Sequence, residues 1–213
     1  MSSLVTLSFF IAIISGLTVH EFAHAWMANR LGDPTARLEG RLTLNPIKHL
    51  DPIGTLVMVV LIFTAGLGFG WGKPVPVNPY NLKHKNGDMW VSLAGPFSNF
   101  ILALLVALLF ALISPTVIAG WSNDFVNLIK ILISVNVALG IFNLMPIPPL
   151  DGSKVLFSLL PPGKNEIKNF LERYSLIIFF FLIFFGLSVL GQLSRFIVKM
   201  ILLLSNLINS LIY

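Results

Sequence analysis

The sequence predicts an all-α polytopic membrane protein, with about five to six membrane helices and a re-entrant or extended hairpin element near residues 53–81. Hydrophobic residues make up 56% of the 213 residues and charged residues only 11%, whereas about 25% of a typical globular protein is charged. The mean hydropathy is +0.88. A soluble fold of this composition would lack the polar groups that an exterior needs to face water, so the composition fits a lipid bilayer.

Six apolar segments reach or approach the length of about 20 residues that a helix needs to cross a bilayer. The first is a retained helix rather than a signal peptide, because no basic region precedes it and no small-residue cleavage site follows it. The last is amphipathic, so it either lies in the interface or turns its polar stripe towards other helices. The segments are 4–28, 53–70, 90–113, 125–145, 174–191 and 194–213.

Two stretches are too rich in proline or glycine to be helical. Three prolines between Pro146 and Pro149 end the fourth segment just before Asp151, because proline lacks a donor and clashes with the preceding turn. Residues 66–81 alternate glycine with other residues and then read Pro-Val-Pro-Val, which predicts an extended hairpin or loop. Irregular backbone at membrane depth persists only where protein buries it or where it lines a wet cavity.

The distribution of positive charge predicts the topology, because Lys and Arg favour cytoplasmic loops. Loops 29–52, 71–89 and 146–173 carry Lys or Arg, whereas loop 114–124 carries neither. The first three loops are therefore expected on the cytoplasmic side and the last one outside. Segment 53–70 must then begin and end on the cytoplasmic side of the membrane. The alternative is that it crosses the membrane and the glycine-rich stretch re-enters it to return to that side.

An H-E-x-x-H motif runs from His20 through Glu21 to His24 inside the first apolar segment. Residues i and i+4 share one helix face, so both imidazoles can bind one Zn²⁺, and Glu21 can act as the general base on a zinc-activated water. Ionisable groups in a membrane helix are costly unless they face a cavity or a partner. The alternative is a helix end at the interface whose polar side chains are simply solvated.

A catalytic zinc site usually has three protein ligands and one open position. The chain has no cysteine, so the third ligand must be His, Asp or Glu. Asp151 is favoured because it closely follows a membrane segment and precedes Gly152, which lets the backbone approach closely. An ordinary Asp-Gly turn is the alternative. The other candidates are Asp51, Asp88, Asp124, His49 and His84.

The chain resembles the site-2 protease family of intramembrane zinc metalloproteases, in its compact bacterial and archaeal form. The resemblance covers most of residues 10–160 and rests on the H-E-x-x-H motif, on Ala94-Gly95-Pro96-Phe97-Ser98-Asn99, and on the stretch from Asn143 to Gly152. It implies that His20, His24 and Asp151 bind one Zn²⁺ per chain. It further implies that Glu21 is the catalytic base and that Asn143 positions the substrate backbone near the metal.

The expected protein is therefore a single integral-membrane metalloprotease domain, residues 1–213, with a catalytic core of about residues 4–160 and C-terminal helices at 174–213. It would hydrolyse peptide bonds within or near transmembrane segments, with its active site towards the cytoplasmic side of the cell membrane. Its partners would be a membrane-protein substrate and the lipid bilayer, and not nucleic acid. The alternatives are a metal-ion transporter or channel, which also has ionisable groups at membrane depth, and a catalytically inactive membrane scaffold.

Four further polar residues have weaker predictions. His49 and His84 are expected to be solvated loop histidines. Asn99 and Asn136, inside membrane segments, are expected to hydrogen-bond between helices, with a substrate role as the alternative. The Pro-Val-Pro-Val stretch is either an edge that pairs with an extended substrate or a plain surface loop.

Overall fold

The computed structural model describes residues 3–65, 70–113, 115–161, 163 and 165–212. Within these residues the chain is mostly helical, and its one β-bridge joins Leu50 to Gly72. The all-α prediction is confirmed. The helices are α1 (Ser3–Arg30), α2 (Thr35–Leu38), α3 (Pro52–Ala65), α4 (Gly87–Ala111), α5 (Pro115–Ala119), α6 (Asn123–Asn143), α7 (Asp151–Leu159), α8 (Asn165–Arg173), α9 (Ser175–Phe181) and α10 (Leu187–Ile212).

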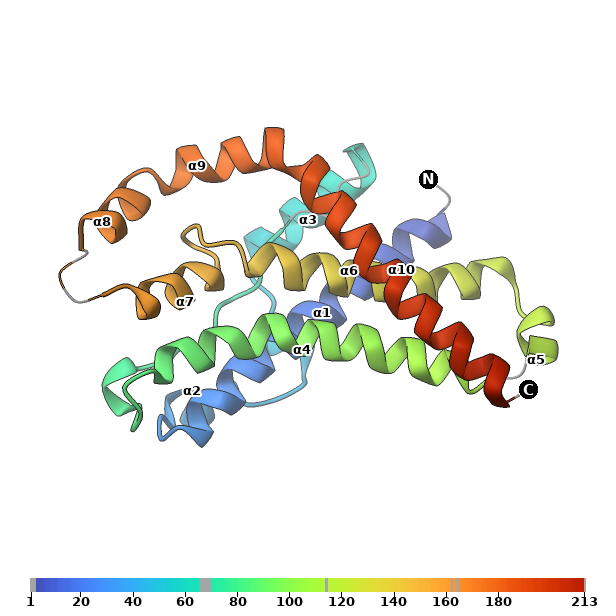
Figure 1. The fold of residues 1–213 in the computed structure, drawn as a ribbon, viewed down its shortest axis with the longest axis horizontal. Helices are drawn as coiled ribbons and strands as arrows, with labels where there is room; N and C mark the ends of the chain where they lie inside the picture. Colours follow the sequence, from blue (N-terminus) through green and yellow to red (C-terminus); the bar gives the residue numbers. More distant parts are fainter. Residues whose placement is uncertain (1–2, 66–69, 114, 162, 164, 213) are drawn as a thin grey trace.

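Helices α1, α4 and α6 pack against one another and form the centre of the molecule (Figure 1). The buried face of α4 repeats every fourth residue, a spacing that puts small side chains on one stripe. Small residues at this spacing let neighbouring helix backbones approach closely. The members of the stripe are Gly95, Asn99, Ala103, Ala107 and Ala111.

Helix α10 crosses α4 and α6 obliquely (Figure 1) and contacts both. Its apolar residues Leu190, Ile197 and Ile201 pack on the core cluster that α4 and α6 form between them. Near its C-terminus, Ser205 donates to the carbonyl of Ala107, and Asn209 donates to the carbonyls of Ala111 and Ile113. One of these acceptors, the carbonyl of Ala111, belongs to the last turn of α4, whose carbonyls have no partner within their own helix.

The chain that leaves residue 50 returns to the same place at residue 72. Leu50 and Gly72 form an antiparallel bridge, and the amide of Lys73 donates to the carbonyl of His49 at 2.8 Å. Helix α3 between them has 14 residues, fewer than a span of the bilayer needs. The pairing of Leu50 with Gly72 agrees with a re-entrant element, which stays a prediction; the part of the glycine-rich prediction that falls on residues 66–69 lies outside the described residues.

Four helices are long and apolar enough to cross a membrane, namely α1, α4, α6 and α10. The predicted C-terminal segments 174–191 and 194–213 have different boundaries in the structure. A single helix runs from Leu187 to Ile212, while α9 and a π-turn at Leu182–Gly186 precede it. Gly191 does not interrupt α10, because tertiary packing overrides the weak helix propensity of one glycine.

The two ends of the molecule differ in what they carry (Figure 1). Both termini and α5 lie at one end, and α2, α7 and α8 lie at the other. The H-E-x-x-H motif belongs to the C-terminal half of α1, which runs towards the second end. The H-E-x-x-H motif therefore lies within the helical bundle, close to the end of the molecule that carries the polar loops 31–51 and 70–86.

Candidate metal centre

Two imidazoles from one face of α1 meet a carboxylate from α7. Both Nε2 atoms, of His20 and of His24, lie 3.1 Å from Oδ2 of Asp151, and they lie 3.0 Å from each other. The two histidines are buried, and the side chain of Asp151 is 13% exposed. Three ligand atoms thus converge within 4.8 Å of one another, the only such group among the described residues.

Hydrogen bonds behind the two rings fix which nitrogen faces the centre. Nδ1 of His20 donates to Oδ1 of Asn99 at 2.8 Å, and Nδ1 of His24 donates to the carbonyl of Val91 at 2.7 Å. The orientation of the Asn99 amide follows from its nitrogen, which donates to the carbonyl of Gly16 and to Oδ1 of Asn136. A neutral ring carries one proton, so both Nε2 lone pairs point at the centre.

Asp151 is the first residue of α7, directly after the proline-rich turn that ends α6. The turn reverses the chain, so the carboxylate comes back to the side where α1 and α4 meet. A carboxylate is the form in which Asp151 would bind a metal.

Gly95 of α4 lies directly behind the two imidazoles. A Cβ atom at this position would be 2.6 Å from Cε1 of His20 and 2.6 Å from Cε1 of His24, closer than real Cβ contacts. Any side chain at residue 95 would therefore push the rings out of place. Glycine here lets α4 support the rings from behind by backbone alone.

This arrangement fits a zinc ion. Two neutral imidazole nitrogens and one carboxylate oxygen form a three-ligand set typical of catalytic zinc, which leaves one position open. Each histidine also donates its second nitrogen to an acceptor, as metal-binding histidines commonly do. Without a cation, two lone pairs and a negative charge would face one another in a buried space, which is unfavourable.

Glu21 lies beside the ligands, and its carboxylate contacts a different part of the chain. Its Oε2 accepts a hydrogen bond from the amide of Val75 at 2.8 Å. Arg41 donates to the carbonyl of Lys73 at 2.7 Å. The extended stretch 72–77 is therefore fixed by Glu21 through an amide and by Arg41 through a carbonyl. Because the amides of Lys73 and Val75 are both engaged and prolines have none, this edge has fewer free donors than strand addition would use.

The other predicted residues have mixed outcomes. Asn143 is the last residue of α6, and its amide nitrogen donates to the carbonyl of Leu139 one turn back, so no described contact links it to the ligands. The bond between Asn99 and Asn136 confirms the interhelical prediction. His84 is exposed as predicted. The prediction of a solvated loop histidine is wrong for His49: its ring is buried, and Nε2 donates to the carbonyl of Thr43 at 2.7 Å, because the loop folds over the ring.

Sequence reasoning missed two supports of the ligands. Asn99 was recognised as an interhelical residue but not as the acceptor for His20, because the two residues are 79 positions apart. The role of Gly95 could have been predicted from the sequence, since a glycine inside an apolar helix often marks the close approach of another helix. Asp51, Asp88 and Asp124, the other acidic candidates, do not join the ligand group.

Comparison with known proteins agrees with this geometry. The model of peptidase family M50 matches residues 8–120 and 112–186. No solved structure matches the chain.

Curated relatives extend over most of the chain. "Putative zinc metalloprotease YwhC" of Bacillus subtilis is 42% identical over 173 residues, which are 79% of this chain and 76% of that protein. "Putative zinc metalloprotease Rip2" of Mycolicibacterium smegmatis is 38% identical over 72% of this chain, and the match spans only 59% of the relative. "Putative zinc metalloprotease MJ0611" of Methanocaldococcus jannaschii is 30% identical over 73% of this chain and 72% of its own length.

The family match spans far more than half of the chain, and the matched residues include the converging histidines and aspartate. Four helices are apolar and long enough for a multi-pass membrane protein. The relatives are described as zinc metalloproteases, and the donor set here is one that zinc prefers. The chain belongs to peptidase family M50, the site-2 proteases, and is a membrane metalloprotease with zinc as its cofactor.

Proposed function

We propose that the protein is an intramembrane protease that hydrolyses peptide bonds within or near transmembrane segments of other membrane proteins. The observation that carries the proposal is the convergence of Asp151 on His20 and His24, which lie inside a helix that is apolar enough to span the bilayer. In this proposal these three residues hold one Zn²⁺, Glu21 is the general base, and Asn143 binds the substrate backbone.

The depth of the site supports cleavage inside the membrane. His24 and His20 precede Arg30, the last residue of α1, by 6 and 10 residues. At 1.5 Å per residue they lie roughly 9 and 15 Å below that end of the helix. A peptide bond at this depth belongs to a segment embedded in the bilayer, whose hydrocarbon core is about 30 Å thick.

Glu21 is placed to move a proton. Its carboxylate is half-buried on the same helix as the ligands, next to His20 in the sequence. When bound, zinc supplies Lewis acidity that activates water and polarises the scissile carbonyl. Glu21 would take the proton of the attacking water and pass it to the leaving amine. The amide of Val75 donates a hydrogen bond to Oε2 of Glu21 and so orients this side chain.

Asn143 would bind the substrate rather than the metal. It is the last residue of α6, and a proline-rich turn separates it from Asp151. Its side chain is half-buried. Its amide now bonds to its own helix at Leu139, a weak local interaction that an extended peptide can replace. A membrane substrate must unwind locally to be cut, since a helix satisfies its own amides, and an asparagine carboxamide can pair with the exposed backbone.

The test compares the wild type with Glu21→Gln. Both proteins are purified in detergent, their zinc content is measured, and both are incubated with a panel of single-span membrane substrates. We expect about one zinc per chain in each protein, and a fall in cleavage of at least 10²–10⁴-fold for the variant. Glu39→Gln is the matched control, because Glu39 is exposed in a loop and has no part in the proposed chemistry.

Three outcomes would overturn the proposal. If the purified wild type contains no zinc, the proposed metal chemistry is wrong. If the Glu21→Gln variant cleaves as well as the wild type, Glu21 is not the general base. Zinc binding by both proteins with no cleavage of any substrate, together with metal flux in liposomes, would instead identify a transporter.

A further inference from the structure

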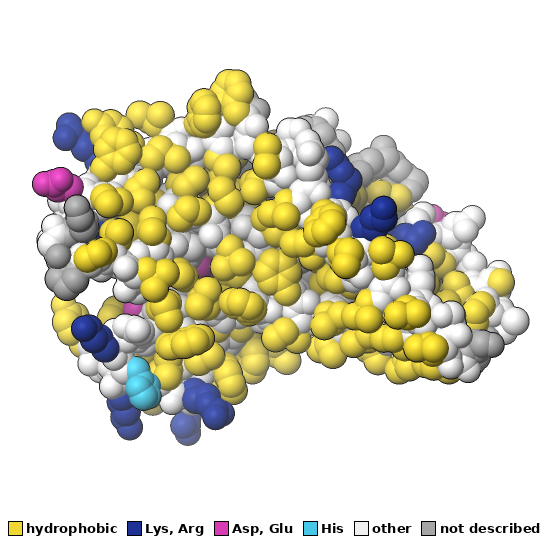
Figure 2. Space-filling view, in the orientation of Figure 1, with side chains coloured by type: hydrophobic (Ala, Val, Ile, Leu, Met, Phe, Trp, Pro, Cys, Tyr) yellow, Lys and Arg dark blue, Asp and Glu magenta, His cyan; other side chains and the backbone are white. Residues whose placement is uncertain are grey.

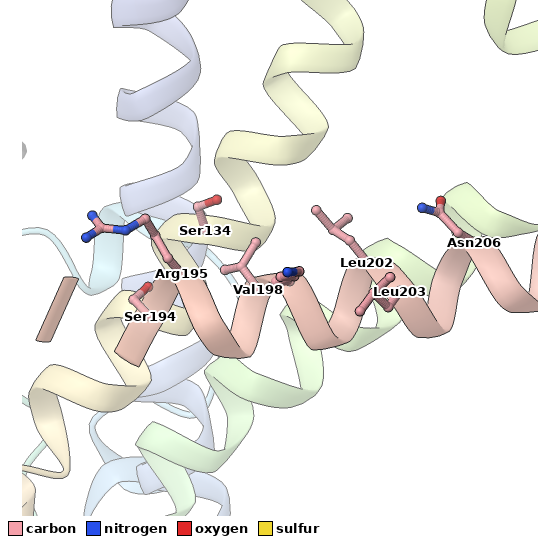
Figure 3. A pocket seen from close by; sticks show the side chains of 8 residues that line it. Ser134, Ser194, Arg195, Val198, Leu202, Leu203 and Asn206 are labelled. Atoms are coloured by element: carbon pink, nitrogen blue, oxygen red, sulfur yellow. The ribbon is translucent and has the colours of Figure 1, made fainter. Parts of the chain in front are cut away.

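A groove lined by both apolar and polar side chains lies between α6 and α10, away from the metal centre. It has a volume of about 380 Å³, and its lining combines the cations Arg195 and Lys199 with Ser134, Ser194 and Asn206. Figure 3 shows Ser134 projecting from α6 towards the α10 side chains. Lys130 is one turn before Ser134 on α6, so it shares that face and is exposed.

The groove lies near the middle of two helices that are long and apolar enough to cross a bilayer. Lys199 is 12 residues from the start of α10 and 13 from its end, roughly 18 and 20 Å at 1.5 Å per residue. Ser134 is 11 residues from the start of α6 and 9 from its end, again close to the centre. If α10 spans the bilayer, Lys199 thus belongs to the central part of that span.

The cations of the groove have no partner within the described residues. No ion pair or hydrogen bond reaches Lys130, Arg195 or Lys199; the ion pairs present are those of Asp151 and one between Lys168 and Glu172. Figure 2 shows Lys and Arg side chains on an otherwise apolar surface, where α10 crosses α6. Charged groups at this depth are costly and normally pair with another group, so the groove requires a partner.

A second copy of this chain does not supply that partner. Of the nine acidic residues, the ones within the four long apolar helices are Glu21, Asp88 and Asp124. Asp88 and Asp124 belong to first helical turns, far from mid-membrane. Glu21 lies at the metal centre and bonds to Val75.

We infer that this groove binds a membrane-spanning helix of a different protein that carries an Asp or Glu near its midpoint. The partner carboxylate would pair with Lys199 and Arg195, while Ser134 and Asn206 offer hydrogen bonds beside it. Flanking residues of α10 such as Phe196 and Leu203 are exposed and apolar, and would pack on the rest of that helix. The groove is separate from the metal ligands, so the inference does not depend on which peptide bond the enzyme cuts.

The test uses a synthetic helix of leucine and alanine with one central glutamate, and a twin with glutamine in its place. Each carries an acceptor dye, and the protein carries a donor dye on Gly120→Cys, because the chain has no natural cysteine. Energy transfer is measured in phosphatidylcholine vesicles near neutral pH. We expect the glutamate helix to bind the wild type roughly three- to twentyfold more tightly than its twin.

Matched variants assign that preference to the groove. The double variant Arg195→Gln, Lys199→Gln should lose it, whereas Lys168→Gln, Arg173→Gln, which removes the same charge from exposed positions of α8, should keep it. Ser134→Leu fills the groove from α6 without changing any charge and should also lose the preference. Zinc content and thermal midpoint confirm that each variant is folded.

Equal binding of the two helices by the wild type would overturn the inference, as would a preference that survives both groove variants. A spin-labelled phosphatidylglycerol that associates with the wild type more than with the double variant, while the two helices bind equally, would make the groove a lipid site instead. Because catalysis is not the readout, an inactive protein that keeps the glutamate preference would support the inference and contradict only the proposed function.

Discussion

At the scale of single residues, the acceptors behind the two imidazoles decide which nitrogen atoms face the candidate metal centre. Asn99 holds His20 through Nδ1, and its own amide is fixed by Gly16 and Asn136. These contacts join α1, α4 and α6 at one buried point. The same residues therefore connect the packing of the three helices with the tautomer of a ligand.

We expect Asn99→Ala to lower zinc affinity about 10- to 100-fold, the usual effect of removing the partner of a metal-binding histidine. Without Asn99, Nδ1 of His20 loses its acceptor, and the ring can rotate or change tautomer. Competition with a chromogenic chelator measures the affinity. Asn143→Ala is the matched control, because Asn143 has no contact with the ligands; equal zinc affinity in all three proteins would contradict the positioning role.

Gly95→Ala tests the close approach of α4 to the ligands. The added methyl would be 2.6 Å from Cε1 of both histidines, so the rings must shift or the helices separate. We expect loss of stoichiometric zinc and a stability loss of about 1–3 kcal/mol, as for other overpacked sites. Gly191→Ala in α10 is the control, since its methyl would meet only the Arg195 side chain, at 3.5 Å. A Gly95→Ala protein with full zinc and activity would refute the argument.

Sequence spacing was enough to predict the two histidines and Glu21, because i and i+4 define one helix face. Asp151 was predictable as a candidate from its place after the proline turn, and its choice over other acids came from the family resemblance. The burial of His49 was not predictable, since it depends on how a polar loop folds back over its own ring. Long-range contacts of this kind are set by tertiary packing rather than by local pattern.

At the scale of elements, the polar loops at the site end are organised by one buried carboxylate. Asp33 is fully buried and accepts hydrogen bonds from the amide and hydroxyl of Thr35, the amide of Asn78 and the side chain of Asn81. It thereby ties the end of α1 to the residues after the extended stretch 72–77. Burial alone raises the pKa of Asp33, but these hydrogen bonds outweigh it and lower the pKa from 3.8.

A depressed pKa gives Asp33 a defined effect of pH on stability. The stabilisation is complete above the unfolded-state value near 3.8 and is lost as the pH falls through the lower folded-state value. We expect Asp33→Asn to cost roughly 1.5–3 kcal/mol near pH 7, as for hydrogen bonds to a charged group, and progressively less as the pH falls below 3.8. Thermal midpoints of both proteins in detergent measure the difference.

Asp124→Asn is the control for this prediction, because Asp124 is exposed in the first turn of α6. We expect this variant to change stability by no more than about 0.5 kcal/mol at neutral pH. A loss for Asp33→Asn that is as large in acid as at neutral pH would show that the shape of the side chain matters and not its charge.

Element boundaries followed from the sequence where polar or proline residues interrupt apolar segments. The ends of α4 and α6 lie close to those predicted for 90–113 and 125–145. The C-terminal region had no such interruption, so the bend between α9 and α10 at the π-turn of Leu182–Gly186 could not be located. That bend results from packing, as when Phe179 of α9 contacts Phe142 of α6.

At the scale of the whole molecule, the number of crossings decides whether the site can form. His20 and His24 are near the end of α1, and Asp151 follows the end of α6. These ends meet only if an even number of spans separates them. Helices α4 and α6 supply two, and the bridge between Leu50 and Gly72 returns α3 to its own starting side.

Cysteine accessibility in intact cells tests this topology, and the absence of natural cysteine makes each reporter unambiguous. We expect Glu39→Cys, His84→Cys and Glu166→Cys, all at exposed positions, to react with a membrane-impermeant maleimide only after the cells are opened. Gly120→Cys, beyond α5, should react in intact cells. The positive charge of the first three loops is the physical reason for this orientation.

Each possible result has a separate meaning for the fold. If His84→Cys reacts from the side opposite to Glu39→Cys, the stretch between them crosses the bilayer once, and the pairing of Leu50 with Gly72 must be wrong. If all four reporters exchange sides together, the fold stands and only the cytoplasmic location of the site fails. The comparison of Glu39→Cys with His84→Cys is therefore decisive for the re-entrant element, because charge alone can reverse a whole protein but cannot move one loop past its bonded neighbour.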